Sequence, residues 1–167
     1  MSLNSIINFT LHGSSGVSVL AKDFLKWLET HRSEELGEKI VAYSWHVDEK
    51  FFKININIKK HYWRELPDSS GFICFESEAK PDNCALLDVY GKERMRLTVP
   101  WQMTGSTSPE SGESPTSFEN ISTPYANPAD GKKGKFGVTA WVEHAGKYYF
   151  ELDNHTGQFL WCKRIMD

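Results

Sequence analysis

Paired cysteines, long apolar runs and blocks of like charge are all missing from this sequence. It has three cysteines, an odd number, and no CxxC spacing, which excludes a disulfide scaffold and a structural zinc site. Cys74, Cys84 and Cys162 each lie in apolar, strand-like runs, as free thiols do in a reducing compartment. No stretch approaches the roughly 18 apolar residues of a membrane span, so we expect a cytoplasmic protein without a membrane partner.

The charge balance predicts that nucleic acid is not a partner. The 19 basic and 22 acidic residues give a formal net charge of −3. Binding to a phosphate backbone needs clustered Lys and Arg, because the affinity comes from neutralising several phosphates at once. The basic groups at Lys59-Lys60 and Lys132-Lys133 are short and are typical of solvated turns.

The sequence also lacks the common catalytic signatures. It contains no P-loop, dinucleotide-binding fingerprint, GxSxG, HExxH or EF-hand loop. We therefore predict no cofactor, no metal and no catalytic residue, and we favour a protein that is not an enzyme.

Aromatic residues are what the sequence has in excess, at 13% with six Trp. Large rings favour pleated, half-buried surfaces, so this composition favours β-sheet. The apolar fraction of 40% and the length of 167 residues suit one core, and we predict a single domain over residues 1–167.

The N-terminal part predicts one strand and one helix. Ile6 to Leu11 alternates between apolar and polar residues, as a half-buried strand does. From Val17 to His31 apolar residues recur at helical spacing, and this pattern predicts an amphipathic helix.

After the helix the period changes to two. Further strands are predicted at Lys39–Val47, Phe51–Lys59, Phe72–Ser77, Cys84–Tyr90 and Arg94–Val99. The turn between the first two is predicted at Val47 to Lys50. Residues 104–135 are rich in Ser, Thr, Gly, Pro and Glu and predict a long polar loop within the domain.

The C-terminal third predicts a three-stranded meander with turns at Ala145-Gly146 and at Asn154 to Gly157. The registers that these turns set place five large apolar residues on one face: Trp141, Phe150, Leu152, Phe159 and Trp161. We therefore expect a β-rich α+β fold, an antiparallel β-sandwich or barrel of eight or nine strands with one N-terminal amphipathic helix.

The best candidate for a ligand-binding site is the run from His61 to Glu65. Trp, Tyr and Arg dominate binding hot spots, and this run combines them as His61, Tyr62, Trp63, Arg64 and Glu65. A second candidate is the segment from Trp101 to Pro128, in which Trp101 and Tyr125 could stack on a sugar or a peptide. The alternative interpretation of the first run is a strand end in which Trp63 packs inward.

A metal or acid–base site built from His144 and His155 is not expected. The strand between them spans about six residues at about 3.3 Å each, so their rings should lie roughly 20 Å apart. Asp153 and Asn154 near His155 are typical of a turn.

Three short stretches resemble the bacterial inclusion-body protein family, the group that includes PixA and AidA. They are Trp63-Arg64-Glu65 after Lys59-Lys60, Ala85-Leu86-Leu87 leading to Tyr90, and the closing pattern Gly157, Phe159, Trp161 and Ile165. Cys162-Lys163 stands where the family has Asp-Pro, and the N-terminal third does not match. The resemblance implies a β-sandwich in the bacterial cytoplasm that associates with itself and has a lectin-like or storage role.

Three functions follow as hypotheses. The first is a non-enzymatic, self-associating or binding protein of bacterial type that takes a protein or carbohydrate ligand, with a homo-oligomer as one form. The second is a toxin-neutralising immunity protein, because small, acidic α+β domains without catalytic residues suit that role. The third is a small hydrolase or nuclease with a His/carboxylate site, which requires a His beside an acidic residue in a cleft.

Overall fold

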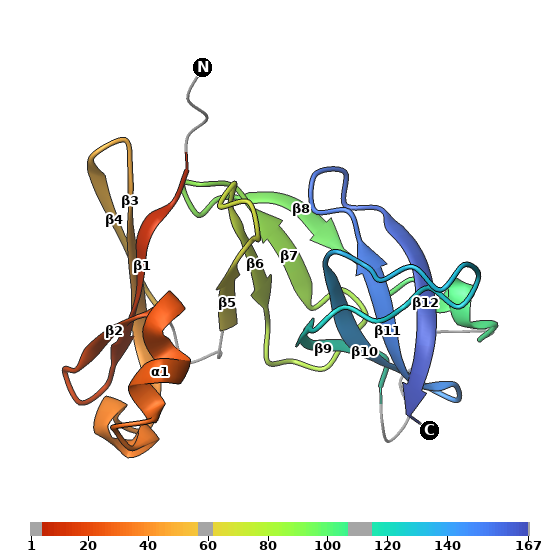
Figure 1. Cartoon of the computed structure of the whole chain (residues 1–167), viewed down its shortest axis with the longest axis horizontal. Coiled ribbons are helices and arrows are strands. Elements are labelled where there is room, and N and C mark those ends of the chain that lie inside the picture. Colours follow the sequence, from red (N-terminus) through yellow and green to blue (C-terminus); the bar gives the residue numbers. More distant parts are fainter. Residues whose placement is uncertain (1–4, 57–61, 107–114, 167) are drawn as a thin grey trace. The chain divides into compact units, whose positions relative to one another are not determined.

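The computed structural model describes residues 5–56, 62–106 and 115–166 of the chain. This part contains twelve β-strands (Figure 1). They are β1 (Ile7–Gly13), β2 (Ser18–Leu20), β3 (Ile40–Val47), β4 (Lys50–Asn55), β5 (Tyr62–Glu65), β6 (Phe72–Phe75), β7 (Cys84–Leu87), β8 (Glu93–Leu97), β9 (Ser117–Ser122), β10 (Gly137–Val142), β11 (Gly146–Leu152) and β12 (Phe159–Met166). One short helix, α1 (Phe24–Leu28), and the 3-10 turns η1 (Ala21–Asp23), η2 (Ser33–Leu36) and η3 (Trp101–Thr104) complete the described elements.

The strands form three antiparallel sheets of four strands each. Their orders are β2-β1-β3-β4, β5-β6-β7-β8 and β12-β11-β10-β9. The β-rich, sandwich-like class is confirmed. The expected barrel and the strand number of eight or nine are wrong: the described sheets are open, and β2, β5 and β9 were not predicted as strands.

The chain divides into two compact units. Unit 1 comprises residues 1–72 and 87–92, and unit 2 comprises residues 73–86 and 93–167. Each unit is described by itself below.

The predicted helix at Val17–His31 is wrong over much of its length. The α-helical segment has five residues, Phe24–Leu28, and β2 lies where the first helical turn was expected. β2 pairs with β1, with Leu20 opposite Thr10 and Ser18 opposite His12. Because β2 buries Val19, which is 6% exposed, pairing with β1 outweighs the local helical pattern.

Aromatic rings fill the core of unit 1. Trp45 of β3 is 2% exposed and contacts Trp63 and Phe72 at ring-centroid distances of 5.7 and 4.9 Å. Its indole Nε1 donates a hydrogen bond of 2.7 Å to the carbonyl of Val89. Phe9 of β1 packs on the other side of Phe72 at 4.9 Å. The inner faces of β1 and β3 thus bury their rings against β5 and Phe72.

The predicted turn between β3 and β4 is confirmed. Val47 pairs with Lys50, and the two residues between them, Asp48 and Glu49, have φ of 49° and 69°. Positive φ at both central positions is the backbone of a type I′ hairpin turn. β4 ends at Asn55, so it is shorter than the predicted strand Phe51–Lys59, of which residues 57–59 lie outside the described part.

The C-terminal meander is confirmed, but its predicted common face is wrong. β10 pairs with β11 with Val138 opposite Phe150, three positions away from the expected pairing of Trp141 with Phe150. An odd shift moves a strand's side chains to the opposite face. In the second hairpin Leu152 lies opposite Phe159 as expected, and a register shift follows at once between Glu151 and Leu152.

The phenyl and indole rings therefore separate onto opposite faces of this sheet. Phe150 contacts Phe159 at 5.8 Å on one face, and Tyr149 contacts Trp161 at 5.4 Å on the other. Both Phe150 and Tyr149 are fully buried. The sheet is covered on both sides at β11.

Within the predicted loop at 104–135 the structure places strand β9, Ser117–Ser122, which pairs with β10. Phe118 of β9 is buried, and its backbone N–H donates a hydrogen bond of 2.8 Å to the side chain of Asn83. An isolated bridge joins Ala126 to Lys133 further along. Burial of the Phe118 ring and pairing with β10 thus stabilise a strand within a segment of polar composition.

None of the helices in the described ranges has the length and apolarity that crossing a membrane requires.

Candidate functional site

A cavity of about 390 Å³ opens within unit 1. Elements far apart in the sequence surround it: β1 and β3, the start of α1, and β5. Its lining consists of Phe9, Leu11, Ala21, Lys22, Phe24, Ile40, Tyr43, Tyr62, Trp63, Arg64, Glu65 and Leu66. This volume lies in the range of about 300–1,000 Å³ that is typical of ligand pockets.

The aromatic part of the lining is held by the core. Phe9 and Tyr43, on neighbouring strands, lie with ring centroids 5.2 Å apart, and Tyr43 lies 5.8 Å from Trp63. The backbone N–H of Trp63 donates a hydrogen bond of 3.2 Å to the hydroxyl of Tyr43. Because all three residues are at most 5% exposed, these rings form a fixed apolar surface inside the cavity.

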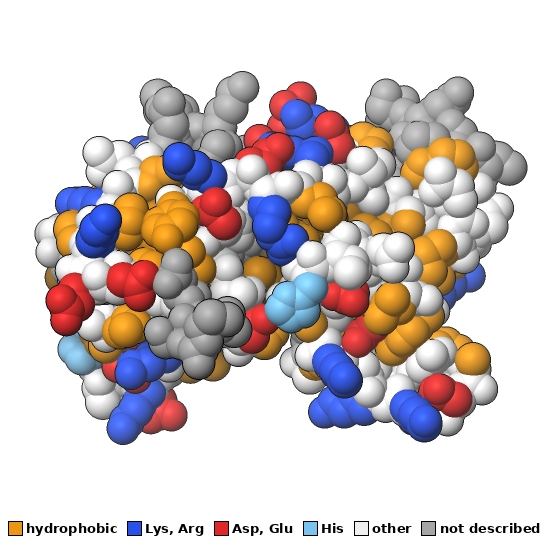
Figure 2. All heavy atoms as spheres, turned by 90° about the horizontal axis from the view of Figure 1, so that it is seen from above, with side chains coloured by type: hydrophobic (Ala, Val, Ile, Leu, Met, Phe, Trp, Pro, Cys, Tyr) orange, Lys and Arg blue, Asp and Glu red, His pale blue; other side chains and the backbone are white. Residues whose placement is uncertain are grey.

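Two cationic side chains in the lining are exposed to solvent, Lys22 of η1 and Arg64 of β5. Arg64 Nε donates a hydrogen bond to the Tyr62 hydroxyl, and its guanidinium carbon lies 4.8 Å from the centre of that ring. No ion pair joins Lys22 or Arg64 to another described residue. Elsewhere acidic, basic and hydrophobic side chains are interspersed on the face drawn in Figure 2.

The one carboxylate in the lining, that of Glu65, already accepts a hydrogen bond within the protein. Glu65 Oε2 accepts a hydrogen bond of 2.6 Å from the hydroxyl of Ser69. A neighbouring hollow of about 230 Å³ shares Phe9, Lys22 and Glu65 with the cavity. Lys22 therefore borders both hollows.

The structure places the predicted residues Tyr62, Trp63, Arg64 and Glu65 together along this cavity. Trp63 packs inward, as the alternative interpretation held, and still lines the cavity. His61 lies outside the described residues. That a ligand binds here stays a prediction.

Trp101 and Tyr125, the second candidate, belong to unit 2. Trp101 begins η3 and is half-buried. The Tyr125 ring packs on Tyr149 at 5.2 Å, and Lys163 Nζ lies 5.5 Å from its centre. Tyr125 thus packs on the sheet β12-β11-β10-β9 and remains 36% exposed.

Sequence reasoning missed the other half of the cavity. Lys22 lies on the polar face of the predicted helix Val17–His31, Phe9 lies on the apolar side of the predicted strand Ile6–Leu11, and Tyr43 lies in a predicted strand with no face assigned. The alternation of apolar residues in Ile6–Leu11 does signal that Phe9 and Leu11 point inward. Nothing in the sequence indicates that this face lies across from Tyr62–Glu65.

A His–carboxylate pair does occur in unit 2, at the turn between β10 and β11. His144 Nε2 lies 3.7 Å from Glu143 Oε1, but the His144 side chain is 85% exposed. Glu143 Oε2 is buried and has no hydrogen-bond partner among the described residues. Within those residues no group of three His, Cys, Asp or Glu side chains is placed to hold a metal ion.

The cysteines give no sign of an activated thiol. Burial, and then the neighbouring Cys74, raise the pKa of Cys84 far above the ordinary range. Burial also raises the pKa of Cys162. Because the thiolate is the nucleophile, a raised pKa makes both thiols less reactive.

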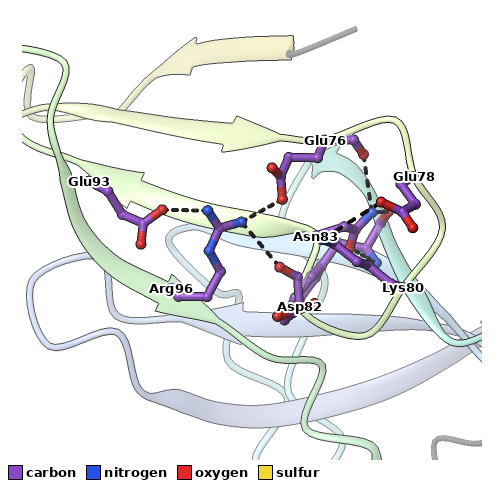
Figure 3. A network of polar contacts seen from close by, with 8 residues as sticks. Glu76, Glu78, Lys80, Asp82, Asn83, Glu93 and Arg96 are labelled. Atoms are coloured by element: carbon purple, nitrogen blue, oxygen red, sulfur yellow. Dashed lines mark hydrogen bonds and ion pairs between the residues drawn. The ribbon is translucent and has the colours of Figure 1, made fainter. Parts of the chain in front are cut away.

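A cluster of charged side chains in unit 2 serves the fold (Figure 3). Arg96 of β8 donates to Glu76 Oε1 at 2.6 Å, to the carbonyl of Asp82 at 3.2 Å and to Glu93. The carboxylates of Glu76 and Glu93 are thus used within the cluster. This cluster ties β6, β7 and β8 together at their polar edge.

Comparisons with known proteins give a fold relationship. No protein-family model matches the chain, and no curated protein matches it. A chain in the solved structure described as "Structure of Tne2 in complex with Tni2" superposes with a TM-score of 0.60 and 11% identity, over 96% of this chain and 99% of that chain. The two chains share a fold, and the neighbour was solved in a complex of two proteins.

Proposed function

We propose that this chain is a toxin-neutralising immunity protein, which acts by binding a partner protein through the cavity of unit 1. The cavity carries this proposal: it is concave and aromatic, and its lining includes Tyr62, Trp63 and Arg64. These three residue types dominate the energetics of protein interfaces. The net charge of −3 and the small α+β fold suit the same role.

The fold relationship supports a protein partner. The structural neighbour is one chain of a complex between Tne2 and Tni2. A fold seen in a two-protein complex offers surfaces that can bind another chain, although the fold itself does not specify the partner.

The test uses the protein encoded beside the gene for this chain. Expression of that protein in a bacterium should arrest growth, and co-expression of this chain should restore it. The purified proteins should form a complex, measured by isothermal titration calorimetry. Growth arrest that this chain does not relieve, together with no heat of binding, would contradict the proposed function.

A charge reversal locates the binding surface. Arg64→Glu should weaken the complex about tenfold or more, which corresponds to about 1.4 kcal/mol, because Arg64 lies exposed in the cavity lining. Lys80→Glu is the control, since it makes the same charge change in unit 2, at a side chain that is 40% exposed and pairs with the exposed Glu78. Equal affinities of the two variants would remove the cavity from the interface.

The carbohydrate and self-association hypotheses predict different results. A lectin-like protein should bind sugars on a glycan array, and a self-associating protein should sediment as an oligomer without any partner. Either result, obtained without binding to the neighbouring gene's product, would favour those hypotheses over an immunity protein.

A further inference from the structure

The chemistry of the cavity in unit 1 specifies what part of a partner it can receive. Its walls come from Phe9, Tyr43 and Trp63, whose rings pack on one another, and the Tyr43 hydroxyl accepts a hydrogen bond from the backbone N–H of Trp63. A rigid apolar surface binds an apolar group with little loss of its own conformational freedom. An aromatic or large aliphatic side chain therefore suits the interior.

The charges in the lining select the group next to that side chain. Lys22 and Arg64 are exposed and make no ion pair with a described residue, whereas the Glu65 carboxylate accepts a hydrogen bond from Ser69. Two cations and one carboxylate give the lining a net charge of +1, so an incoming ligand meets a positive potential. A carboxylate next to the apolar group would complement it.

The charge balance of this cavity is not shared by every hollow of unit 1. Another hollow of the same unit, of about 540 Å³, is lined by Asp23, Lys26 and Glu29 together with uncharged residues. Acidic groups outnumber basic ones there. In the lining of the cavity, by contrast, Lys22 and Arg64 outnumber the one carboxylate, Glu65.

Arg64 is also held ready for a planar anion. Its Nε is used by the Tyr62 hydroxyl and its guanidinium lies over the Tyr62 ring, which fixes the direction of the side chain. Because the side chain is already held in one direction, its terminal nitrogens lose less conformational entropy when they bind a ligand. A guanidinium binds a carboxylate through two parallel hydrogen bonds.

From these observations we infer that the cavity receives an anchor of the partner protein that consists of an aromatic or large aliphatic side chain followed by an acidic residue. This inference rests on the proposed function, because it names the part of the partner that the cavity holds. The apolar side chain fills the space beside Trp63, and the carboxylate pairs with Arg64 and Lys22.

Short peptides test the inference without the partner. Acetyl-Phe-Asp-amide should bind weakly, with a Kd on the order of 1 mM, and should shift the NMR signals of residues that line the cavity. Acetyl-Phe-Lys-amide should bind at least tenfold more weakly, because its ammonium group meets Lys22 and Arg64. Acetyl-Ala-Asp-amide should also bind at least tenfold more weakly, since it lacks the ring.

Variants of the protein should reverse the preference. With Lys22→Glu and Arg64→Glu combined, the Phe-Lys peptide should become the tighter ligand, and Lys80→Glu should leave the original order unchanged. Both substituted residues are exposed, and the circular dichroism spectrum checks that the double variant is folded. Equal affinities for the Asp and Lys peptides, equal affinities for the Phe and Ala peptides, or no shifts at the cavity would each overturn the inference.

The two proposals fail in different experiments. If the chain neutralises its partner while the peptides show no charge or ring preference, the anchor chemistry is wrong and the proposed function stands. If the peptides behave as expected but the neighbouring gene's product does not bind, the proposed function is wrong and the ligand chemistry of the cavity stands.

Discussion

The two units of this chain satisfy their buried groups in different ways. In unit 1 the largest buried side chains are rings that pack on one another, and Trp45 Nε1 reaches a backbone carbonyl. In unit 2 buried polar side chains bond to the backbone of other segments. Glu151 binds the N–H groups of Lys135 and Phe136, and Asn83 binds both the N–H and the carbonyl of Phe118.

This difference accompanies the position of the cavity, which lies in unit 1. Rings pack with their own preferred geometry, and in unit 1 they leave a space bordered by Phe9, Tyr43 and Trp63. In unit 2 the side chains of Glu151 and Asn83 have their donors and acceptors matched, so these contacts add rigidity rather than affinity. Unit 1 is therefore where substitutions should change binding, and unit 2 where they should change stability alone.

The largest effect on stability is expected from the centre of the aromatic core in unit 1. Trp45→Ala should lower the free energy of unfolding by about 4 kcal/mol, because it removes a fully buried indole and leaves the Val89 carbonyl without its donor. Urea denaturation followed by circular dichroism measures it. Leu25→Ala, at a position 79% exposed in the same unit, should change stability by less than about 0.5 kcal/mol. A loss below about 2 kcal/mol at Trp45 would show that the rings are not the main support of unit 1.

The next largest effect is expected from the buried carboxylate of unit 2. Glu151→Ala should cost about 3 kcal/mol, since it leaves the Tyr149 hydroxyl and the backbone N–H of Lys135 buried without an acceptor. The carboxylate fits closely here: a Cβ added at Gly134 would lie 2.0 Å from Glu151 Oε1.

Glu151→Gln is the control for shape. The amide keeps an oxygen for one donor but places N–H groups toward the other, so its cost should lie between those of the alanine variant and the native protein. If Glu151→Ala were as stable as the native protein, water would have to replace the carboxylate, and the contrast between the two units would disappear.

The sequence predicted elements whose signals are local. The hairpin of β3 and β4 is confirmed because its turn is bounded by Val47 and Lys50 and its strands alternate. The meander of β10, β11 and β12 is confirmed as well, although its first turn lies at residues 143–145 and not at the predicted Ala145-Gly146. The pairing of Leu152 with Phe159 was also found, since the turn after Asp153 fixes it.

The elements that the sequence did not predict depend on distant partners. β2 has three residues and is held by its pairing with β1, and β9 is held by β10 and Asn83. The register between β10 and β11 is set by the conformation of the turn between them, where His144 adopts a φ of 66°. The number of β-branched or apolar residues does not reveal this register, and the observed register places Trp141 on the opposite face from the predicted one.

The candidate site was half predictable. The run from Tyr62 to Glu65 was identified from residue types alone, and these four residues do line a cavity. The opposite wall, with Lys22 and Phe9, comes from segments about 40 and 55 residues earlier. Phe9 lies in a different sheet from β5 and Lys22 lies in η1, and only tertiary packing brings these segments to β5, so the charge of the cavity could not be deduced.

The smallest expected effect is a loss of stability at alkaline pH that comes from the core of unit 2. Burial raises the pKa of Cys84, so its thiol stays neutral in the folded protein while the unfolded chain loses the proton above a pH of about 9. Between that pH and the folded-state pKa the unfolded state binds fewer protons, so stability falls as pH rises. This effect should lower the free energy of unfolding by about 1.4 kcal/mol between pH 7 and pH 10.

Cys84→Ala should flatten the pH dependence of stability by that amount, measured by urea denaturation with a reductant present. Cys162→Ala should flatten it less, because that thiol is half-buried. An unchanged slope in Cys84→Ala would mean that the thiol ionises in the folded state, and the core of unit 2 would then be less closed than its buried polar contacts indicate.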